Sequence, residues 1–465
     1  MRRVDLVRTV AIGLLLGACR DKDGSTPTDD TGNDPGTSAV TVEVNLSEVV
    51  PTVARVRWTT DQPSTGTVSF WEVGGEVLGS RVSSVSATEH EVVLLGLAEG
   101  VQAELQVQVN DETGTWTSQV VPFTTGTFDP IVPRPVLSHG TAADSLGGYT
   151  LLPMGGLEAR WATIVDAHGR LVWAWGGAEL DTQRMRLTHD GLGVILADRE
   201  LGQPGFDLLR VDFDGTEVWR IQVPDGHHDF DLIDDETFLV IAGEPREVTW
   251  MGAPHVLIGD KLVEHRIDGS QRVIWNAWDH LTPQDGDPVE PSSEYKGAFT
   301  WTHANFIRYD AGTDRIHFIL RNLSYITELE RSTGAQRWVL SPETGAGDSL
   351  YYPHSVWPIE DDLLVFNQRD YIHDACSEAV LLDHDGVSST VTPTWTYGTE
   401  TCKSVYYTGN AQPLEEGRAL VSFGSSGVLD EVDMGTGALR WRLTSDLATW
   451  MLYAERVAAL GPLSD

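Results

Sequence analysis

The sequence predicts an all-β protein, a six-bladed β-propeller preceded by a small β-sandwich. Three observations predict this fold. A hairpin pattern recurs six times between residues 128 and 465. Apolar and polar residues alternate with period two between residues 40 and 127. No apolar stripe with a 3.6-residue period is long enough to build a helical core.

Each copy of the hairpin pattern has an apolar strand, an Asp or polar equivalent, a Gly turn and a second strand that ends in Trp. The Asp-Gly and Thr-Gly tips supply the positive φ that tight hairpins need. Six such hairpins fit six blades of four strands around a channel, with the Trp residues packed between neighbouring blades. The copies run from Val165 to Trp173, Val211 to Trp219, Ile267 to Trp275, Leu329 to Trp338, Leu382 to Trp395, and Val432 to Trp441.

The segment 40–127 alternates in the manner of half-buried strands at residues 40–44, 54–58, 66–70 and 103–109. About seven short strands in this length predict an antiparallel sandwich. The segment resembles a fibronectin type III domain, with the Trp at position 58 in its core. No catalytic constellation is evident here, so we interpret the domain as a spacer or docking module.

The first 19 residues are typical of a lipoprotein signal peptide. A basic start and a short apolar stretch at residues 10–16 precede Leu-Gly-Ala-Cys, which resembles a lipobox ending at Cys19. Residues 20–39 form an acidic, low-complexity linker. We therefore expect a lipid-anchored protein of the bacterial cell envelope, in the outer membrane and facing the periplasm or the cell surface. An ordinary signal peptide cleaved nearby is the alternative.

The chain is strongly acidic, with 32 Lys and Arg against 69 Asp and Glu and a formal charge of -37. This charge excludes nucleic acid as a partner, because such binding depends on basic contacts to phosphate. An anionic substrate would need a local cationic pocket. Cys376 and Cys402 could form a disulfide in an exported protein. The sequence leaves the oligomeric state open, with a homodimer as one option.

Polar residues recur at the start of one strand in four successive units. His228, His303, His354 and Asn410 each precede a strongly apolar strand, and we interpret these positions as one structural slot. Equivalent positions in a closed ring point to a common axis, so we expect the three imidazoles to converge there. They could bind a transition metal, or they could act as nucleophile and proton-transfer groups. Each could also be a hydrogen-bonded structural histidine.

The propeller segment resembles the bacterial arylsulfate sulfotransferases over nearly its whole length. The resemblance implies transfer of a sulfuryl group from a phenolic sulfate ester to a phenol, through a sulfohistidine intermediate. The matching segments are His227-His228-Asp229, Trp301 to Asn305, Leu320-Arg321-Asn322, His354 with Leu364 to Asn367, Trp395 to Gly398, Gly424 to Gly427, and Tyr453 to Arg456.

The resemblance also implies roles for individual residues. His354 is the expected nucleophile. His228 and His303 are expected to surround the sulfuryl oxygens and to exchange protons with the phenols. Arg321 is expected to hold the sulfuryl oxygens and to neutralise the charge that develops on them. The family usually has Gln-His-Asp at the nucleophile, whereas this chain has Pro353-His354-Ser355, in which the serine could orient the imidazole. Further expected substrate-binding residues are His227, Asn322, Asn367 and Asn410.

No metal or nucleotide cofactor is expected, because an aryl sulfate is already an activated donor. The enzyme would therefore be independent of the nucleotide sulfate donor PAPS. The main alternative is a non-catalytic envelope propeller that binds a partner or a glycan. A quinone-dependent dehydrogenase relative and a metal-dependent hydrolase or lyase are further alternatives; the former usually has eight blades rather than six.

Overall fold

The structure is a computed structural model. It describes residues 40–461, apart from residue 113 and residues 157–159, 178–179, 200–202, 370–375, 399–401 and 447–448. The predicted signal peptide, the lipobox with Cys19 and the acidic linker lie outside the described residues. Residues Val40–Asp465 belong to one compact unit. Within the described part of the chain, no helix is long and apolar enough to cross a membrane.

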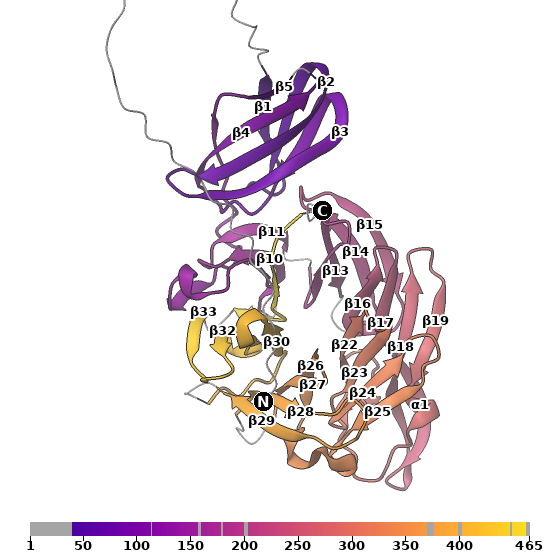
Figure 1. The fold of residues 1–465 in the computed structure, drawn as a ribbon. Coiled ribbons are helices and arrows are strands. Elements are labelled where there is room, and N and C mark those ends of the chain that lie inside the picture. Colours follow the sequence, from indigo (N-terminus) through magenta and orange to yellow (C-terminus); the bar gives the residue numbers. More distant parts are fainter. Residues whose placement is uncertain are drawn as a thin grey trace, which may run out of the picture. The chain divides into compact units, whose positions relative to one another are not determined.

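Six antiparallel sheets follow one another along the chain and confirm the predicted six-bladed propeller (Figure 1). In blades 2 to 6 the strands pair in chain order, so the chain enters each blade at its innermost strand and leaves at its outermost. Blade 2 contains β12 (Met185–Leu187), β13 (Gly193–Asp198), β14 (Phe206–Asp212) and β15 (Glu217–Val223). Blade 3 contains β16 (Gly226–Asp234), β17 (Thr237–Trp250), β18 (Ala253–Arg266) and β19 (Gln271–Asn276). Blade 4 contains β22 (Ala304–Asp310), β23 (Arg315–Leu320), β24 (Tyr325–Glu330) and β25 (Gln336–Leu340). Blade 5 contains β26 (Pro353–Ile359), β27 (Asp362–Asn367), β28 (Glu378–Asp383) and β29 (Thr392–Tyr397). Blade 6 contains β30 (Asn410–Leu414), β31 (Arg418–Ser422), β32 (Val428–Asp433) and β33 (Leu439–Thr444).

Blade 1 closes the ring, because the end of the chain supplies its innermost strand. The segments β34 and β35 pair with β9 and β8, which lie some 300 residues earlier in the chain. A further strand, β7, pairs with β33 at the outer edge of blade 6. The strands involved are β7 (Val136–His139), β8 (Tyr149–Leu151), β9 (Met154–Gly155), β10 (Arg160–Asp166), β11 (Leu171–Gly177), β34 (Trp450–Met451) and β35 (Glu455–Val457).

The six predicted Trp hairpins share one local geometry. In every blade the ladder between the third and fourth strands shifts register directly after the residue that faces the Trp. All six hairpin tips have a glycine at positive φ, as predicted; Gly215 has φ 91°. The Trp173 indole donates to the backbone oxygen of Phe213 in blade 2, and Trp441 donates to Ala167 in blade 1. These two indoles therefore join their hairpins to the next blade.

Residues 41–124 form a separate six-stranded sheet whose core includes Trp58. About seven strands were expected, but the predicted strands 54–58 and 66–70 are parts of the single long β2. Its pairing with β3 shifts register between Thr59 and Gly66, so the strand bends instead of ending. The boundary at residue 127 stays a prediction. The strands are β1 (Thr41–Leu46), β2 (Ala54–Glu72), β3 (Val77–Leu94), β4 (Gln102–Asp111), β5 (Gly114–Thr117) and β6 (Val121–Thr124).

An insertion between blades 3 and 4 interrupts the repeat. It contains α1 (Ala277–His280), β20 (Glu290–Pro291) and β21 (Phe299–Thr300), and β21 pairs in parallel with the extended strand β18. In blade 5, Cys376 and Cys402 form the disulfide that the sequence allowed, with their Cα atoms 4.9 Å apart. The remaining short helical turns are η1 (Ala142–Asp144), η2 (Pro342–Ala346), η3 (Gly347–Ser349), η5 (Glu415–Gly417) and η6 (Gly424–Ser426).

Candidate active site

A cavity of about 250 Å³ opens where the chain enters the innermost strands of blades 3, 4 and 5. Its polar lining combines imidazoles, guanidinium groups and carboxylates, so charged and titratable groups meet in one cavity. The lining residues are Gln183, Arg199, His227, His228, Ile258, Glu290, Pro291, Ser292, Ser293, Glu294, Thr300, His303, Arg321, His354, Gln368, Tyr406, Tyr407 and Thr408.

The three predicted histidines come together, although they do not share one slot in the repeat. His303 directly precedes β22 and Tyr352 directly precedes β26, with φ of 48° and 50°. In the pairing of the first two strands, a bulge then leaves one residue without a partner, Asn305 in blade 4 and His354 in blade 5. His354 therefore corresponds to Asn305, two residues beyond the position of His303. Bulges of this kind turn a side chain from one face of a strand to the other.

Backbone strain accompanies this convergence. His228 and His303 both have left-handed φ, 60° and 48°, a region that costs a non-glycine residue energy. A backbone hydrogen bond holds His303 there, since the Arg321 amide donates to the His303 carbonyl at 3.2 Å. Such strained residues cluster at functional sites, where the fold fixes side chains that would not otherwise point inward.

Imidazoles and carboxylates form a continuous chain along one wall of the cavity. Nε2 of His227 lies 3.0 Å from Oδ1 of Asp260, and Nδ1 of His227 lies 2.8 Å from Nδ1 of His228. Nε2 of His228 lies 3.1 Å from Nε2 of His303. Nδ1 of His303 lies 3.1 Å from Oε2 of Glu290. His227, predicted to bind substrate, therefore has both ring nitrogens occupied by protein groups.

The environment separates the histidines into two kinds. Burial disfavours charge on His227, but the Asp260 carboxylate outweighs burial and raises the pKa of His227. Burial and the neighbouring imidazoles hold the pKa of His228 well below its usual value. Burial also lowers the pKa of His303, against the opposing effect of Glu290. His303 and Arg321 together lower the pKa of Glu290 to about 2 despite its partial burial.

Arg321 is the predicted cation, and it is held rigidly at the cavity wall. Its Nε donates to Gln368 at 2.7 Å, and its Nη1 donates to Glu290 at 3.1 Å and to Asn322 at 2.9 Å. Its guanidinium group stacks on the ring of Tyr352. Asn322 was predicted to bind substrate, but its amide oxygen is used to orient Arg321.

Two other predicted substrate-binding residues lie away from the cavity lining. Asn367 is fully buried, donates to the Ser349 carbonyl at 2.7 Å and accepts from the Tyr351 amide. Asn410 accepts from Trp357 at 3.1 Å and donates to the Ala454 carbonyl at 2.7 Å. The Asn367 side chain therefore anchors a loop, and the Asn410 side chain joins neighbouring blades. These hydrogen bonds explain why a polar residue is buried at each of the two positions.

His354 reaches the cavity from β26 as a neutral imidazole. Burial, followed by the nearby Arg321, lowers the pKa of His354 to about 3. Its Nδ1 is buried and accepts no hydrogen bond from the described residues. Ser355 does not orient this ring as the sequence allowed, because its hydroxyl accepts the Ala411 amide of blade 6 at 3.1 Å. Successive strand residues point to opposite faces, which separates the two side chains.

Sequence analysis missed several cavity residues. Arg199 pairs with Glu294 at 3.0 Å, and the Tyr407 hydroxyl accepts from Gln183 and Arg160. Glu294 belongs to the insertion between blades 3 and 4, which has no counterpart in the other repeats. The 63-residue interval from Trp275 to Trp338 is the signal that could have indicated this insertion.

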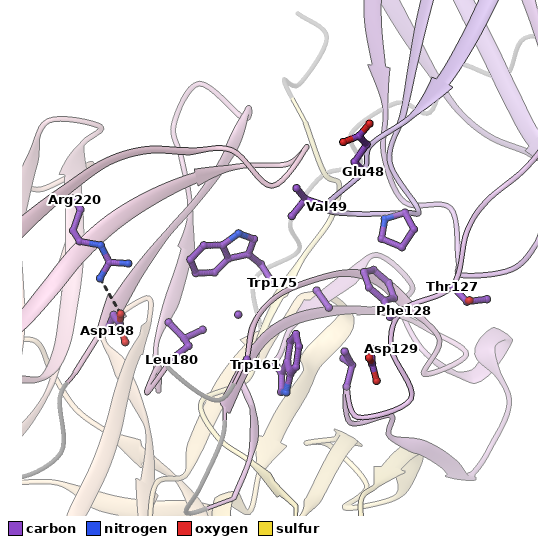
Figure 2. Close-up of a pocket in the computed structure, with 15 residues that line it drawn as sticks. Glu48, Val49, Thr127, Phe128, Asp129, Trp161, Trp175, Leu180, Asp198 and Arg220 are labelled. Atoms are coloured by element: carbon purple, nitrogen blue, oxygen red, sulfur yellow. Dashed lines mark hydrogen bonds and ion pairs between the residues drawn. The ribbon is translucent and has the colours of Figure 1, made fainter.

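A second cavity, of about 950 Å³, lies beside blades 1 and 2 (Figure 2). Trp161 and Trp175 face it, and its Arg220 is paired with Asp198 at 2.9 Å. Its lining contains no histidine among the described residues. Within the same described part of the chain, no group of His, Cys, Asp and Glu has the arrangement of a metal site.

We expect the buried histidines to make stability depend on pH. The ordinary histidine pKa is 6.5, and in the fold the pKa of His354 is about 3. The unfolded chain binds more protons between these values, so the unfolding free energy falls as pH drops through this window. Urea denaturation from about pH 7 to about pH 4.5 should show this loss, and His354→Gln should reduce it. The exposed His168→Gln serves as the control. Equal pH dependence in all three proteins would contradict the prediction.

The fold and the cavity define the class of the protein, a six-bladed propeller with a site of converging imidazoles and arginines near the innermost strands. Residues 149–449 match the family described as Arylsulfotransferase (ASST). This match spans more than half of the chain, and the chain belongs to the arylsulfotransferase family. Membership supports arylsulfotransferase activity at the family level, with a small aryl sulfate as donor and a phenol as acceptor.

Solved structures resemble the chain only distantly. A nidogen/laminin complex is 11% identical, covers 72% of this chain and 94% of that chain, and has a TM-score of 0.34. A protein of unknown function from Bacteroides caccae is 14% identical, with 67% and 97% covered and a TM-score of 0.38. Apo AztD from Citrobacter koseri is 10% identical, with 91% and 100% covered and a TM-score of 0.29. No curated protein matches the sequence.

Proposed function

We propose that the chain transfers a sulfuryl group from an aryl sulfate to a phenol through a covalent intermediate on His354. The observation that carries the proposal is a neutral imidazole in the same cavity as Arg321, His228 and His303. A neutral imidazole has a free electron pair and can attack sulfur, whereas an imidazolium cannot. The low pKa of His354 keeps this form available at neutral pH.

Arg321 supplies the positive charge that the sulfuryl group needs in a chain of net charge -37. Gln368, Asn322 and Glu290 fix the guanidinium group at the cavity wall, so its positive charge is held in place before the donor binds. When His354 attacks, the S–O bond to the donor breaks and the phenolate leaves with its electron pair. The phenolate of a phenol with a pKa of about 10 is an adequate leaving group. The donor is itself activated, so the proposed reaction requires neither PAPS nor a metal.

The proposal is tested by trapping the intermediate. The full-length protein is incubated with 4-nitrophenyl sulfate in the absence of a phenol acceptor, and the digest is analysed by mass spectrometry under non-acidic conditions. We expect one sulfuryl group on the peptide containing His354, lost in acid or on addition of a phenol. Release of nitrophenol without labelling of His354, or no release at all, would contradict the proposed mechanism.

A control distinguishes the proposed nucleophile from other histidines of the same blade. His384 is buried in blade 5, and its Nε2 lies 2.7 Å from the Ser388 carbonyl, outside the cavity. The peptide containing His384 should carry no label. Labelling of both peptides would indicate non-specific sulfation of histidines by the donor.

A further inference from the structure

The insertion between blades 3 and 4 supplies the carboxylates of the histidine-lined cavity. Its strands β20 and β21 form a short hairpin over residues 290–300, and Glu290 and Glu294 both belong to it. Among the described residues that line the cavity, the charged side chains other than histidines are these two glutamates, Arg199 and Arg321. The hairpin therefore contributes all of the negative charge in this described lining.

Each arginine of the cavity is paired with one glutamate of the hairpin. Nη1 of Arg321 donates to Oε1 of Glu290 at 3.1 Å, and Nη1 of Arg199 donates to Oε1 of Glu294 at 3.0 Å. Glu290 is ionised at neutral pH, because the neighbouring His303 and Arg321 lower its pKa to about 2. The two positive charges thus face two negative charges before any ligand binds.

The orientation of Arg321 does not depend on Glu290 alone. Its Nε donates to Gln368 at 2.7 Å, its Nη1 also donates to Asn322 at 2.9 Å, and its guanidinium group lies over the Tyr352 ring at 4.6 Å. These three neighbours hold the guanidinium group without adding charge, because two amides and a phenol ring are neutral. Glu290 adds a negative charge to a side chain that is already held, so its main effect is on the charge of the cavity.

Hydrogen bonds keep the hairpin in place beside the cavity. The Ser292 hydroxyl accepts the amides of Glu294 and Tyr295 at 3.2 and 3.0 Å. The Tyr295 hydroxyl donates to the carboxylate of Asp225, which lies in the turn between β15 and β16. The backbone of the hairpin is therefore fixed to the propeller, and its two carboxylates stay near the cavity when a ligand binds.

Charged groups just outside the lining add no net positive charge to the cavity. Asp181 lies 3.6 Å from Nε of Arg199, but it also forms an ion pair with Arg160. Asp260 is the partner of His227, with Oδ1 of Asp260 3.0 Å from Nε2 of His227. Each of these cations therefore has its own carboxylate, as the two cavity arginines do.

This balance of charge bears on two tetrahedral groups of similar shape. A sulfate ester carries one negative charge, whereas a phosphate monoester carries close to two at neutral pH, because its second pKa is about 6. Two guanidinium groups without counter-ions would favour the dianion. When both are paired, the second charge of a phosphate has no uncompensated cation and is repelled by Glu290 and Glu294.

We propose that Glu290 and Glu294 form a charge filter, which admits aryl sulfates with one negative charge and rejects aryl phosphates with two. This filter rests on the proposed sulfuryl transfer, and it gives a role in substrate selection to an insertion that the other blades lack. Glu290 has the larger expected effect, because its partner Arg321 is the cation assigned to the sulfuryl group. Glu294 acts through Arg199, the second guanidinium group of the cavity.

The test measures binding of two ligands whose groups cannot be transferred. Benzenesulfonate carries one negative charge and phenylphosphonate carries two at about pH 8.5, and in each a ring is bonded directly to the tetrahedral group. Titration calorimetry of the full-length native protein should show tighter binding of the sulfonate. In Glu290→Gln we expect the ratio of the two dissociation constants to shift by about tenfold or more in favour of the phosphonate. Glu294→Gln should shift it in the same direction, and it replaces Glu290→Gln if that variant does not fold.

A purely structural role for Glu290 gives a different result. If the carboxylate serves only to position Arg321, its removal weakens both ligands equally, and the unchanged ratio would overturn the filter. Native protein that binds the phosphonate at least as tightly as the sulfonate, or binds neither, would also overturn it. The matched control is Glu217→Gln, which removes one carboxylate from an exposed pair with Arg220, and Glu217 is not part of the cavity lining. It should leave the ratio unchanged.

Turnover separates the filter from the proposed function. If the native protein releases no nitrophenol from 4-nitrophenyl sulfate and His354 is not labelled, sulfuryl transfer is wrong, whatever the binding ratio. If turnover and labelling occur but Glu290→Gln leaves the ratio unchanged, only the filter is wrong. In the active protein, phenylphosphonate should inhibit Glu290→Gln at a concentration about tenfold lower than it inhibits the native protein, relative to benzenesulfonate.

Discussion

Replacing His354 with Ala should abolish sulfuryl transfer while leaving the propeller folded. The imidazole is the only protein group in the proposed mechanism that bonds to sulfur, so we expect kcat to fall by more than about 1,000-fold with any aryl sulfate donor. The residual rate would come from Arg321 and the other cavity groups acting on direct attack by the acceptor. Release of nitrophenol in the presence of a phenol acceptor measures the loss, and circular dichroism checks the fold.

Ser355→Ala is the matched control for this variant. Ser355 follows His354 in the chain, but its hydroxyl accepts the Ala411 amide and takes no part in the cavity. Its removal should lower stability by about 1 kcal/mol and change kcat by less than about threefold. Free imidazole should restore part of the activity of His354→Ala by entering the space that the ring vacated. Wild-type turnover by His354→Ala would show that the nucleophile lies elsewhere.

The blades were predictable because their signal is repeated. The Gly tip and the Trp recur with fixed local spacing, and the register shift beside each Trp gives every copy the same role. Arg321 was predicted from the resemblance to the arylsulfate sulfotransferases rather than from the repeat, and it lies at the cavity wall. The strand period and the turn residues depend on nearby positions in the chain, so they can be recognised in a single sequence.

The detailed site was less predictable because it depends on irregular backbone. Asn305 and His354 are each skipped by a bulge and lie two residues beyond the position of His303 in the repeat, and no sequence period records these bulges. Asn410 looked equivalent to the histidines, but its side chain joins blade 5 to the C-terminal segment that closes blade 1.

The carboxylates of Asp260 and Glu290, which contact His227 and His303, were missed for a related reason. Asp260 lies on the third strand of blade 3, where the repeat pattern gave no reason to look. Glu290 lies in the insertion between blades 3 and 4, which has no repeat at all. Both reach the histidines through long-range contacts that only the fold specifies.

Asp229→Ala should be the most destabilising single change near the site. The Asp229 carboxylate accepts both nitrogens of the Arg184 fork from blade 2 and the Ile307 amide of blade 4 at 2.9 Å. Arg184 also stacks on the rings of Phe306 and Tyr453. The carboxylate thus links blades 2, 3 and 4. Through Arg184 it also links Tyr453, in the C-terminal segment that closes blade 1. Removing it leaves a buried, unpaired guanidinium, so we expect the unfolding free energy to fall by about 3 to 5 kcal/mol.

Urea denaturation of Asp229→Ala measures this loss, and two further variants identify its cause. Glu217→Ala removes a carboxylate from the exposed pair with Arg220 in blade 2 and should cost less than about 1 kcal/mol. Arg184→Met combined with Asp229→Ala should be less destabilising than the sum of the single changes, because the double variant buries no unpaired charge. Additive losses would show that the two residues stabilise the blades independently. The buried Arg184–Asp229 pair would then not be what couples them.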